Sequence, residues 1–476
     1  MRVTGAPSCG QSAAIPSRHC ASVAGAASIP HNGISRINGP VVAWMFHSAV
    51  ASQALEAELL AEAPPSRGPE APLGPEAPLG HLLTAEAFHA PDRTVFRDQP
   101  GRDSWSGRAP RNWEAATAAE AVTRLSSCFV GLGLPPRALI GICLAGGSEA
   151  ALALLAAERS GLTPCLLPVG TDRDILARVI ETAGIQAVVT QGVVGEHRPA
   201  EVLCEIAAGY FRLRFLMAFG PEIPDGVIDL DRVLAESPRR APPFPAANAG
   251  AGIVTLSRRS DDTRLLFRPY SALVAATASI LPPMRIRPEH RILSLLAPDD
   301  LRGLAVGPVA ALLSGAMLEH HGMFVGPALL SALDDPRPTH LIAPGWMEPT
   351  LAKLEYSQAI ASIVLVHDAP VRFRASMELK GTIIDVLAFD EIALIAGART
   401  PSGLFALSLD TAANGKAVAD LLSVRIESDD TVSFSGPAAL VGDVKGGNLP
   451  HLGDATGWRS SGFKADLFAG IIIGVS

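Results

Sequence analysis

The chain has 476 residues, 48% of them hydrophobic, and a mean hydropathy of +0.28, so it is long and apolar enough to form more than one core. A net charge of −8, a pI near 5.9 and the lack of a basic stripe interleaved with aromatic residues argue against nucleic-acid binding. The six cysteines are scattered without a C-x-x-C pair, which is typical of reduced thiols.

The sequence contains no apolar stretch as long as a membrane span; the best run, residues 306–317, is too short. No apolar signal segment follows Arg2. We therefore expect a cytoplasmic protein with no membrane span.

Residues 1–80 are rich in Ala, Ser, Gly and Pro and have no periodicity, apart from an apolar-polar stretch at 43–62. The hexapeptide Gly-Pro-Glu-Ala-Pro-Leu occurs twice in tandem, at 68–73 and 74–79, as in low-complexity linkers. We expect a disordered leader at 1–80. Met45 is an alternative start to Met1, because nothing before it resembles a domain.

From His81 onwards, apolar strands alternate with helices. Helices are predicted at 115–132, 148–160, 172–183, 271–281, 304–314 and 327–334. Strands are predicted at 139–143, 163–168, 187–190, 251–255, 291–296, 317–320, 340–343, 362–366 and 382–386. Because these strands are continuous apolar runs, we expect an α/β domain at 81–400 with stacked, mostly parallel sheets flanked by helices.

After Gly403 the pattern changes to short β runs at 404–409, 421–426 and 431–434. Short strands of this kind predict a small, antiparallel, barrel-like β subdomain at 401–476.

The segment LSRRSDDTRLLFRPYSAL, at 256–273, lies between a predicted strand and a predicted helix, where a glycine-rich phosphate-binding loop would lie. Such a loop closes its backbone N–H groups around phosphates. Here it contains no glycine, and Asp261 with Asp262 would repel a phosphate. We expect the position of the loop to survive and its chemistry to be lost.

Two other segments are candidate sites. Residues 145–148, Ala-Gly-Gly-Ser, precede a helix and could either accept an anion or let Ser148 cap the helix. His320 and His321 are adjacent rather than at the spacing of metal ligands, so we expect a strand end with one imidazole exposed.

Over residues 81–476 the chain resembles the AMP-forming acyl-CoA synthetases and adenylation domains, in the order of its elements and in several degraded motifs. The family's phosphate loop, T/S-S-G-T-T-G-x-P-K-G, aligns its serine with Ser257 and its basic residue with Arg264. Its three glycines align with Arg258, Asp261 and Leu265. The resemblance therefore implies Ser257 and Arg264 as degenerate nucleotide-binding residues.

The motifs on the acyl-binding side of the family match this sequence better than the nucleotide-binding motifs do. The stretch L-S-L-L-A-P at 293–298, followed by Gly303, and T-H-L-I-A-P at 339–344 both match family motifs. The family's substrate-side histidine falls on Asp300. The resemblance implies Asp300 and Gly303 as substrate-side candidates, with an apolar acyl pocket near them and near residues 343–344.

The remaining nucleotide motifs are broken. The family's S-G-G-A-P-L falls on 366–371, and Y-G-x-T-E falls on 387–391. Leu387 replaces the aromatic residue that stacks on adenine, and only Glu391 remains, which in the family helps to hold Mg²⁺. R-T-G-D falls on 460–463, so that Phe463 replaces the ribose-binding carboxylate. Glu391 is thus the candidate metal ligand, with an ordinary solvated or capping acid as the alternative.

The chain ends where family members continue into a C-terminal subdomain that carries the adenylation lysine, so the resemblance implies a degenerate large domain in which that catalytic subdomain is absent. No catalytic residue is assigned, and ATP and Mg²⁺ are expected only if activity remains. The first hypothesis is a non-catalytic binding or regulatory protein, whose partner would be an acyl ligand, a carrier protein or a catalytic homologue. The alternatives are a carboxylate-activating ligase completed by another chain, and a structural relic.

Overall fold

A computed structural model describes residues 78–237, 251–257, 264–373, 379–400, 407, 416–452, 457–468 and 471–476. Within these ranges the strands form two eight-stranded sheets, here sheets 1 and 2, and a five-stranded sheet 3. Most of the expected leader lies outside the described residues, but α2 (Leu79–His89) begins inside its last two positions.

Sheet 1 has the strand order β16-β15-β13-β12-β10-β11-β1-β2. Its inner strands run parallel, and the two edge strands, β16 and β2, are antiparallel to their neighbours. Its strands are β1 (Thr94–Asp98), β2 (Asn112–Glu114), β10 (Arg291–Ser294), β11 (Met317–His320), β12 (Thr339–Pro344), β13 (Ile360–Asp368), β15 (Ile383–Phe389) and β16 (Ala393–Ala398).

Sheet 2 has the order β19-β9-β8-β4-β3-β5-β6-β7, in which the strands from β8 to β7 run parallel while β9 and β19 are antiparallel to their neighbours. Its strands are β3 (Leu139–Ile142), β4 (Thr163–Leu166), β5 (Ala187–Gln191), β6 (Phe215–Phe219), β7 (Ile228–Asp229), β8 (Gly252–Ser257), β9 (Arg264–Pro269) and β19 (Gly442–Asp443).

Sheet 3 is antiparallel throughout, in the order β14-β21-β20-β18-β17. Its strands are β14 (Val371–Arg372), β17 (Ser423–Ile426), β18 (Thr431–Ser435), β20 (Arg459–Phe468) and β21 (Ile471–Val475). The strand expected at 404–409 lies almost wholly outside the described residues.

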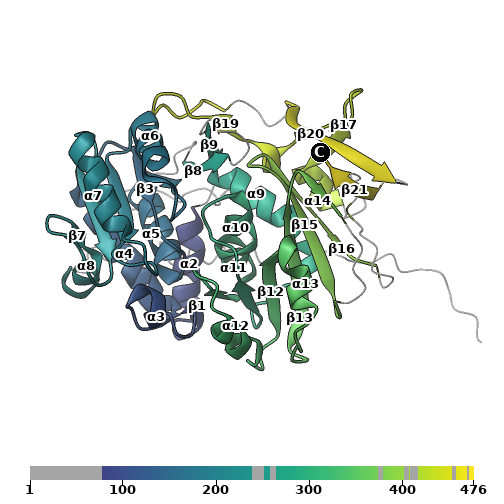
Figure 1. The fold of residues 1–476 in the computed structure, drawn as a ribbon, viewed down its shortest axis with the longest axis horizontal. Helices are drawn as coiled ribbons and strands as arrows, with labels where there is room; N and C mark the ends of the chain where they lie inside the picture. Colours follow the sequence, from purple (N-terminus) through teal and green to yellow (C-terminus); the bar gives the residue numbers. More distant parts are fainter. Residues whose placement is uncertain are drawn as a thin grey trace, which may run out of the picture. The chain divides into compact units, whose positions relative to one another are not determined.

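Helices cover both faces of sheets 1 and 2, as the continuous apolar strands predicted. The helices are α2, α3 (Asp103–Ser106), α4 (Ala115–Gly131), α5 (Ser148–Arg159), α6 (Arg173–Ala183), α7 (Pro199–Gly209), α8 (Leu230–Glu236), α9 (Tyr270–Ile280), α10 (Leu301–Val306), α11 (Pro308–Ser314), α12 (Gly326–Leu333), α13 (Glu348–Leu351) and α14 (Lys416–Leu421). In Figure 1, α2, α9, α10 and α11 lie between the teal strands of sheet 2 and the green strands of sheet 1.

The largest hydrophobic core lies in this middle helical layer and takes side chains from both large sheets. A second core joins α6 and α7 to the other face of sheet 2, and a third joins α12 and α13 to the other face of sheet 1. The stacked α/β architecture expected from the sequence is therefore confirmed. No helix in the described ranges is long and apolar enough to cross a membrane.

Two local predictions were wrong. The single helix expected at 304–314 is two helices, α10 and α11, which meet at Gly307, because Pro308 lacks the N–H that a continuous helix needs. In the segment 256–273, where a loop was expected before the helix at 271–281, residues 256–257 and 264–269 belong instead to the paired strands β8 and β9, with Ser257 opposite Arg264, and α9 follows directly. Residues 258–263, between the two strands, lie outside the described residues.

Candidate functional site

Glu391, in the turn between β15 and β16, reaches across to sheet 2. Its Oε2 accepts a hydrogen bond of 2.6 Å from the Thr255 hydroxyl on β8. The backbone N–H of Leu301, at the start of α10, donates to both carboxyl oxygens at 3.2 and 3.0 Å. The residue is only 3% exposed. The side chain therefore joins three elements rather than facing an open site.

Burial, and then the negative charge of Asp300, raise the pKa of Glu391 to about 8. At neutral pH its carboxyl is therefore mostly protonated and uncharged. The nearby Arg268 guanidinium is fully buried and donates to backbone carbonyls, at 2.5 Å to Glu391 and 2.8 Å to Ala438. Burial also lowers the pKa of Arg268, to about 10.

Asp300 caps helix α10. Its Oδ1 accepts from the backbone N–H of Gly303 at 2.8 Å, and its Oδ2 accepts from the Arg302 guanidinium at 2.5 and 2.9 Å. Arg302 also forms an ion pair with Asp368 at the end of β13. Asp300, which the resemblance placed on the substrate side, is therefore bonded to its own helix and is only 2% exposed.

Gly303 is a packing glycine. A Cβ added there would lie 1.8 Å from the carbonyl oxygen of Ala297, so the preceding loop passes directly over the α10 backbone. Only glycine permits this approach.

Ser257 and Arg264, the two phosphate-loop candidates, bond to different parts of the structure. The Ser257 hydroxyl donates to Asp390 at 2.5 Å, beside Glu391. Arg264, opposite it on β9, pairs instead with Asp443 on β19 and remains 54% exposed. Of the residues aligned with the family's glycines, Leu265 is buried, while residues 258 and 261 lie outside the described residues.

Leu387 and Phe463, which replace the family's adenine-stacking and ribose-binding residues, lie in the hydrophobic core. Leu387 is fully buried in β15. The Phe389 ring packs edge-on against Phe463 at 6.3 Å between centroids, and against Phe434 at 4.8 Å. These rings pack sheet 3 against the end of β15.

The structure thus brings Ser257, Glu391 and Asp300 into one polar cluster and leaves Arg264 at its edge. The described residues contain no group of three or more His, Cys, Asp or Glu side chains placed to hold a metal ion. The sequence reasoning missed Arg268 and Arg302. The signal for Arg268 was a charge directly after the apolar run Leu265–Phe267.

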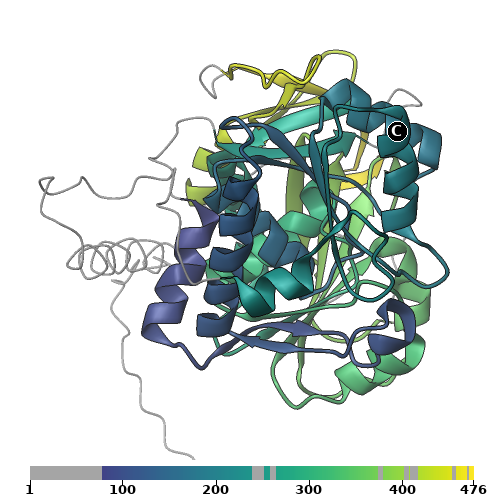
Figure 2. The same cartoon turned by 90° about the vertical axis from the view of Figure 1, so that its left-hand side faces the viewer.

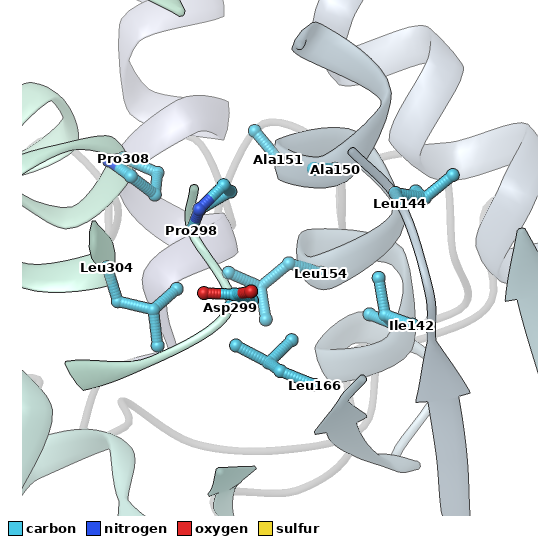
Figure 3. A pocket seen from close by; sticks show the side chains of 10 residues that line it. All are labelled: Ile142, Leu144, Ala150, Ala151, Leu154, Leu166, Pro298, Asp299, Leu304 and Pro308. Atoms are coloured by element: carbon cyan, nitrogen blue, oxygen red, sulfur yellow. The ribbon is translucent and has the colours of Figure 1, made fainter. Parts of the chain in front are cut away.

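A small apolar cavity lies between the β3–α5 region and the loop before α10 (Figure 3). Asp299 and Leu304 line one side, and Ile142 and Leu154 line the other. Its volume of about 10 Å³ is close to what one water molecule requires. The residues that line it do not include 343–344, where the expected acyl pocket also extended.

The N-terminus of α5, one of the candidate anion sites, binds a carboxylate from the chain itself. Asp98 Oδ1 accepts from the Ser148 backbone N–H at 3.0 Å and from its hydroxyl at 2.7 Å. The other oxygen pairs with Arg102 at 2.6 Å. Asp98 ends β1 of sheet 1 and α5 follows β3 of sheet 2, so this carboxylate joins the two large sheets.

The expectation that one imidazole of the histidine pair would be exposed was wrong. His320 and His321 are both buried. His320 Nδ1 accepts from the Gly147 N–H at 2.8 Å, and its Nε2 lies 2.6 Å from the Leu296 carbonyl. The Nε2 atom of His321 lies 3.1 Å from Oε1 of Glu319. Burial lowers the pKa of His320 to about 4, so it is a neutral structural residue.

Comparison with solved structures shows the fold of adenylate-forming enzymes. MbtA of Mycobacterium smegmatis, in its apo form, has a TM-score of 0.62 and 17% identity, over 81% of this chain and 70% of MbtA. The inhibitor-bound N-terminal domain of FACL13 from Mycobacterium tuberculosis has a TM-score of 0.60 and 14% identity, over 84% of this chain and 99% of that domain.

O-succinylbenzoate coenzyme A synthetase (MenE) from Bacillus subtilis, solved with ATP and magnesium, has a TM-score of 0.59 and 13% identity, over 83% of this chain and 98% of MenE. No protein-family model and no curated protein matches the sequence. At these identities the likeness establishes the fold.

Proposed function

We propose that this chain is a non-catalytic relative of the adenylate-forming enzymes, with a binding or regulatory role. The observation that carries the proposal is the burial and hydrogen bonding of Glu391, the one acid retained from the family's nucleotide motifs. A ligand for Mg²⁺ must present an ionised, accessible carboxylate. Glu391 is buried, mostly protonated at neutral pH and already bonded to Thr255 and Leu301.

The neighbouring positions also fit ATP·Mg²⁺ poorly. Leu387 and Phe463 belong to the core and offer no polar atom to a ribose or an adenine. Arg264, the residue aligned with the loop's basic side chain, is engaged by Asp443. Adenylation requires preorganised donors and positive charge around the α-phosphate, and the loss of one such donor costs about 100-fold or more.

As the partner we favour another protein over an acyl ligand. A cavity of about 10 Å³ has no room for an acyl chain without repacking its wall. We therefore favour binding to another protein, such as a carrier protein or a catalytic homologue, through the outer surface.

The test uses the purified full-length chain. We expect no saturable heat when ATP·Mg²⁺ is titrated in by calorimetry, and no ATP–pyrophosphate exchange that depends on an added carboxylate. Glu391→Gln should leave both results unchanged, as should Glu205→Gln, an exposed control. Carboxylate-dependent exchange above a control without protein would overturn the proposal, and its loss in Glu391→Gln but not in Glu205→Gln would assign the activity to this site.

A further inference from the structure

The turn between α7 and β6 holds an aromatic side chain at the surface. Phe211 is 87% exposed, more than any other large apolar residue in the described part of the chain. The backbone around it is fixed: the N–H of Leu213, a buried residue, donates to the Tyr210 carbonyl at 3.0 Å. The N–H of Arg214 donates to the Gln186 carbonyl, before β5, at 2.9 Å. Because the turn is already ordered, little freedom is lost when a partner contacts the Phe211 ring.

Two arginines on the same turn carry charge that the chain does not neutralise. Arg212 and Arg214 are both exposed, and within the described ranges neither forms an ion pair with an acidic side chain. The Arg214 guanidinium lies over the Phe215 ring instead, 5.0 Å from its centroid. The arginines of the neighbouring helices differ, since each pairs with an acid of this chain: Arg173 with Glu205 at 3.0 Å, Arg198 with Glu222 at 2.9 Å and Arg232 with Glu236 at 2.8 Å. The turn therefore presents uncompensated positive charge beside an exposed ring.

This turn lies at the amino ends of β5 and β6, at the opposite edge of sheet 2 from the polar cluster. Ser257 of that cluster ends β8, which runs parallel to β5 and β6. Helix α7 lies on the outer side of the domain, at the left in Figure 1, and this side faces the viewer in Figure 2. A partner bound at the turn therefore leaves the cluster of Ser257 and Glu391 uncovered.

The composition of the turn fits a protein partner with acidic side chains. Aromatic residues and arginine are enriched in the cores of protein–protein interfaces. The whole chain has a net charge of −8, so most of its surface repels an acidic partner. The two arginines therefore direct such a partner to this one turn.

The spacing of the arginines matches a helix. Arg212 and Arg214 are two residues apart, so their Cα atoms lie at most about 7 Å from each other. On a helix, residues i and i+4 lie on one face, about 5–6 Å apart. Two carboxylates one helical turn apart can therefore each meet one guanidinium, while an apolar residue beside them packs on the Phe211 ring.

We propose that Phe211, Arg212 and Arg214 form a docking patch for an acidic amphipathic helix of another protein. This inference rests on the proposed binding role, because it names the class of partner that the chain binds. Phe211 supplies the apolar contact. The arginines supply charge complementarity, which speeds association and weakens as the salt concentration rises.

A synthetic peptide tests this docking on the full-length chain. The probe is a fluorescein-labelled peptide of about 18 residues, long enough to form an isolated helix. It carries Leu on one face, flanked by Glu at positions i and i+4, and the control peptide carries Gln in place of each Glu. Binding is followed by fluorescence anisotropy at pH 7, at low and at physiological salt.

We expect saturable binding of the Glu peptide and not of the Gln peptide. Phe211→Ala should weaken binding about tenfold or more, as the loss of an aromatic anchor does. The double variant Arg212→Gln/Arg214→Gln should weaken it by about as much and remove most of its salt dependence. Two control variants, Phe324→Ala and Arg232→Gln, change exposed residues of the same types elsewhere and should bind like the wild type.

Several outcomes would contradict the docking patch. No saturable binding of the Glu peptide, or equal binding by the wild type and the patch variants, overturns the proposal. Binding that depends on Phe211 to phosphatidylglycerol vesicles or to a single-stranded oligonucleotide, without binding of the peptide, also overturns it and assigns the patch to that ligand. These results are separate from the test of the proposed function, because carboxylate-dependent exchange overturns the non-catalytic role whatever the peptide does, and failure of the peptide leaves that role standing.

Discussion

Replacing Glu391 with glutamine should make the protein more stable at high pH. Glutamine has almost the same shape, can accept from the Leu301 N–H and can bond to the Thr255 hydroxyl, but it carries no charge at any pH. In the wild type, the pKa of Glu391 is raised from 4.5 to about 8 by burial and by Asp300. The folded state therefore binds this proton more tightly than the unfolded state, so the wild type loses stability as the pH rises through this window.

The size of the effect follows from the same values. One pKa unit is worth about 1.4 kcal/mol, so ionising Glu391 in the folded state costs at most about 5 kcal/mol above pH 8. About 3 kcal/mol of this cost develops between pH 5 and pH 8. The variant avoids it, so the difference in unfolding free energy between variant and wild type should rise with pH by an amount of that order.

Urea denaturation at pH 5, 6, 7 and 8 measures this difference. Other groups, among them His320 with its lowered pKa, shape the absolute profiles of both proteins, but they cancel in the difference. A difference that is constant with pH, or that falls as the pH rises, would refute the view that Glu391 is a buried acid kept neutral. It would also remove the main support for the non-catalytic proposal.

Three further substitutions test the local packing by urea denaturation at pH 7. Gly303→Ala should destabilise the fold by at least about 2 kcal/mol, because its Cβ would lie 1.8 Å from the Ala297 carbonyl oxygen. The control Gly131→Ala, with open space around it, should not destabilise the fold. Equal effects of the two substitutions would show that α10 can move away from the loop. Gly146→Ala should also cost about 2 kcal/mol or more, because φ is +108° and the Cβ would lie 2.0 Å from the His320 ring, and a neutral result would contradict this arrangement. Arg264→Ala should cost less than about 1 kcal/mol, because its ion pair with Asp443 is exposed; a larger loss would mean that the pair fixes β19.

Much of the fold could be predicted from the sequence because the local signals agree with the tertiary structure. The apolar run at 139–143 and the helix at 148–160 became β3 and α5 almost unchanged. The predictions were wrong where the apolar periodicity or the local composition did not reflect the backbone structure. Pro308 divides a continuous apolar stretch into two helices, and the turn composition at 256–263 concealed the strand pairing of β8 with β9.

The resemblance indicated where some of the candidate residues would lie, but not what they contact. It selected Ser257, Asp300 and Glu391: Ser257 bonds to Asp390, which adjoins Glu391, and the charge of Asp300 acts on Glu391. The sequence could not show that Asp300 caps its own helix or that Glu391 bonds to Thr255, because both depend on packing between elements far apart in the chain. Charge in a loop looks the same in sequence whether it faces water or the interior.

The pairing of β19 with β9 has a consequence for synthesis on the ribosome. Gly442 and Asp443 complete the edge of sheet 2, while β9 and the rest of that sheet emerge much earlier. Until β19 arrives, β9 presents unpaired N–H and C=O groups along an apolar strand, and such an edge can pair with another nascent chain. Residues 442–443 thus cover the edge strand β9. If synthesis stalls before residue 442, sheet 2 is left with an unpaired edge that can aggregate.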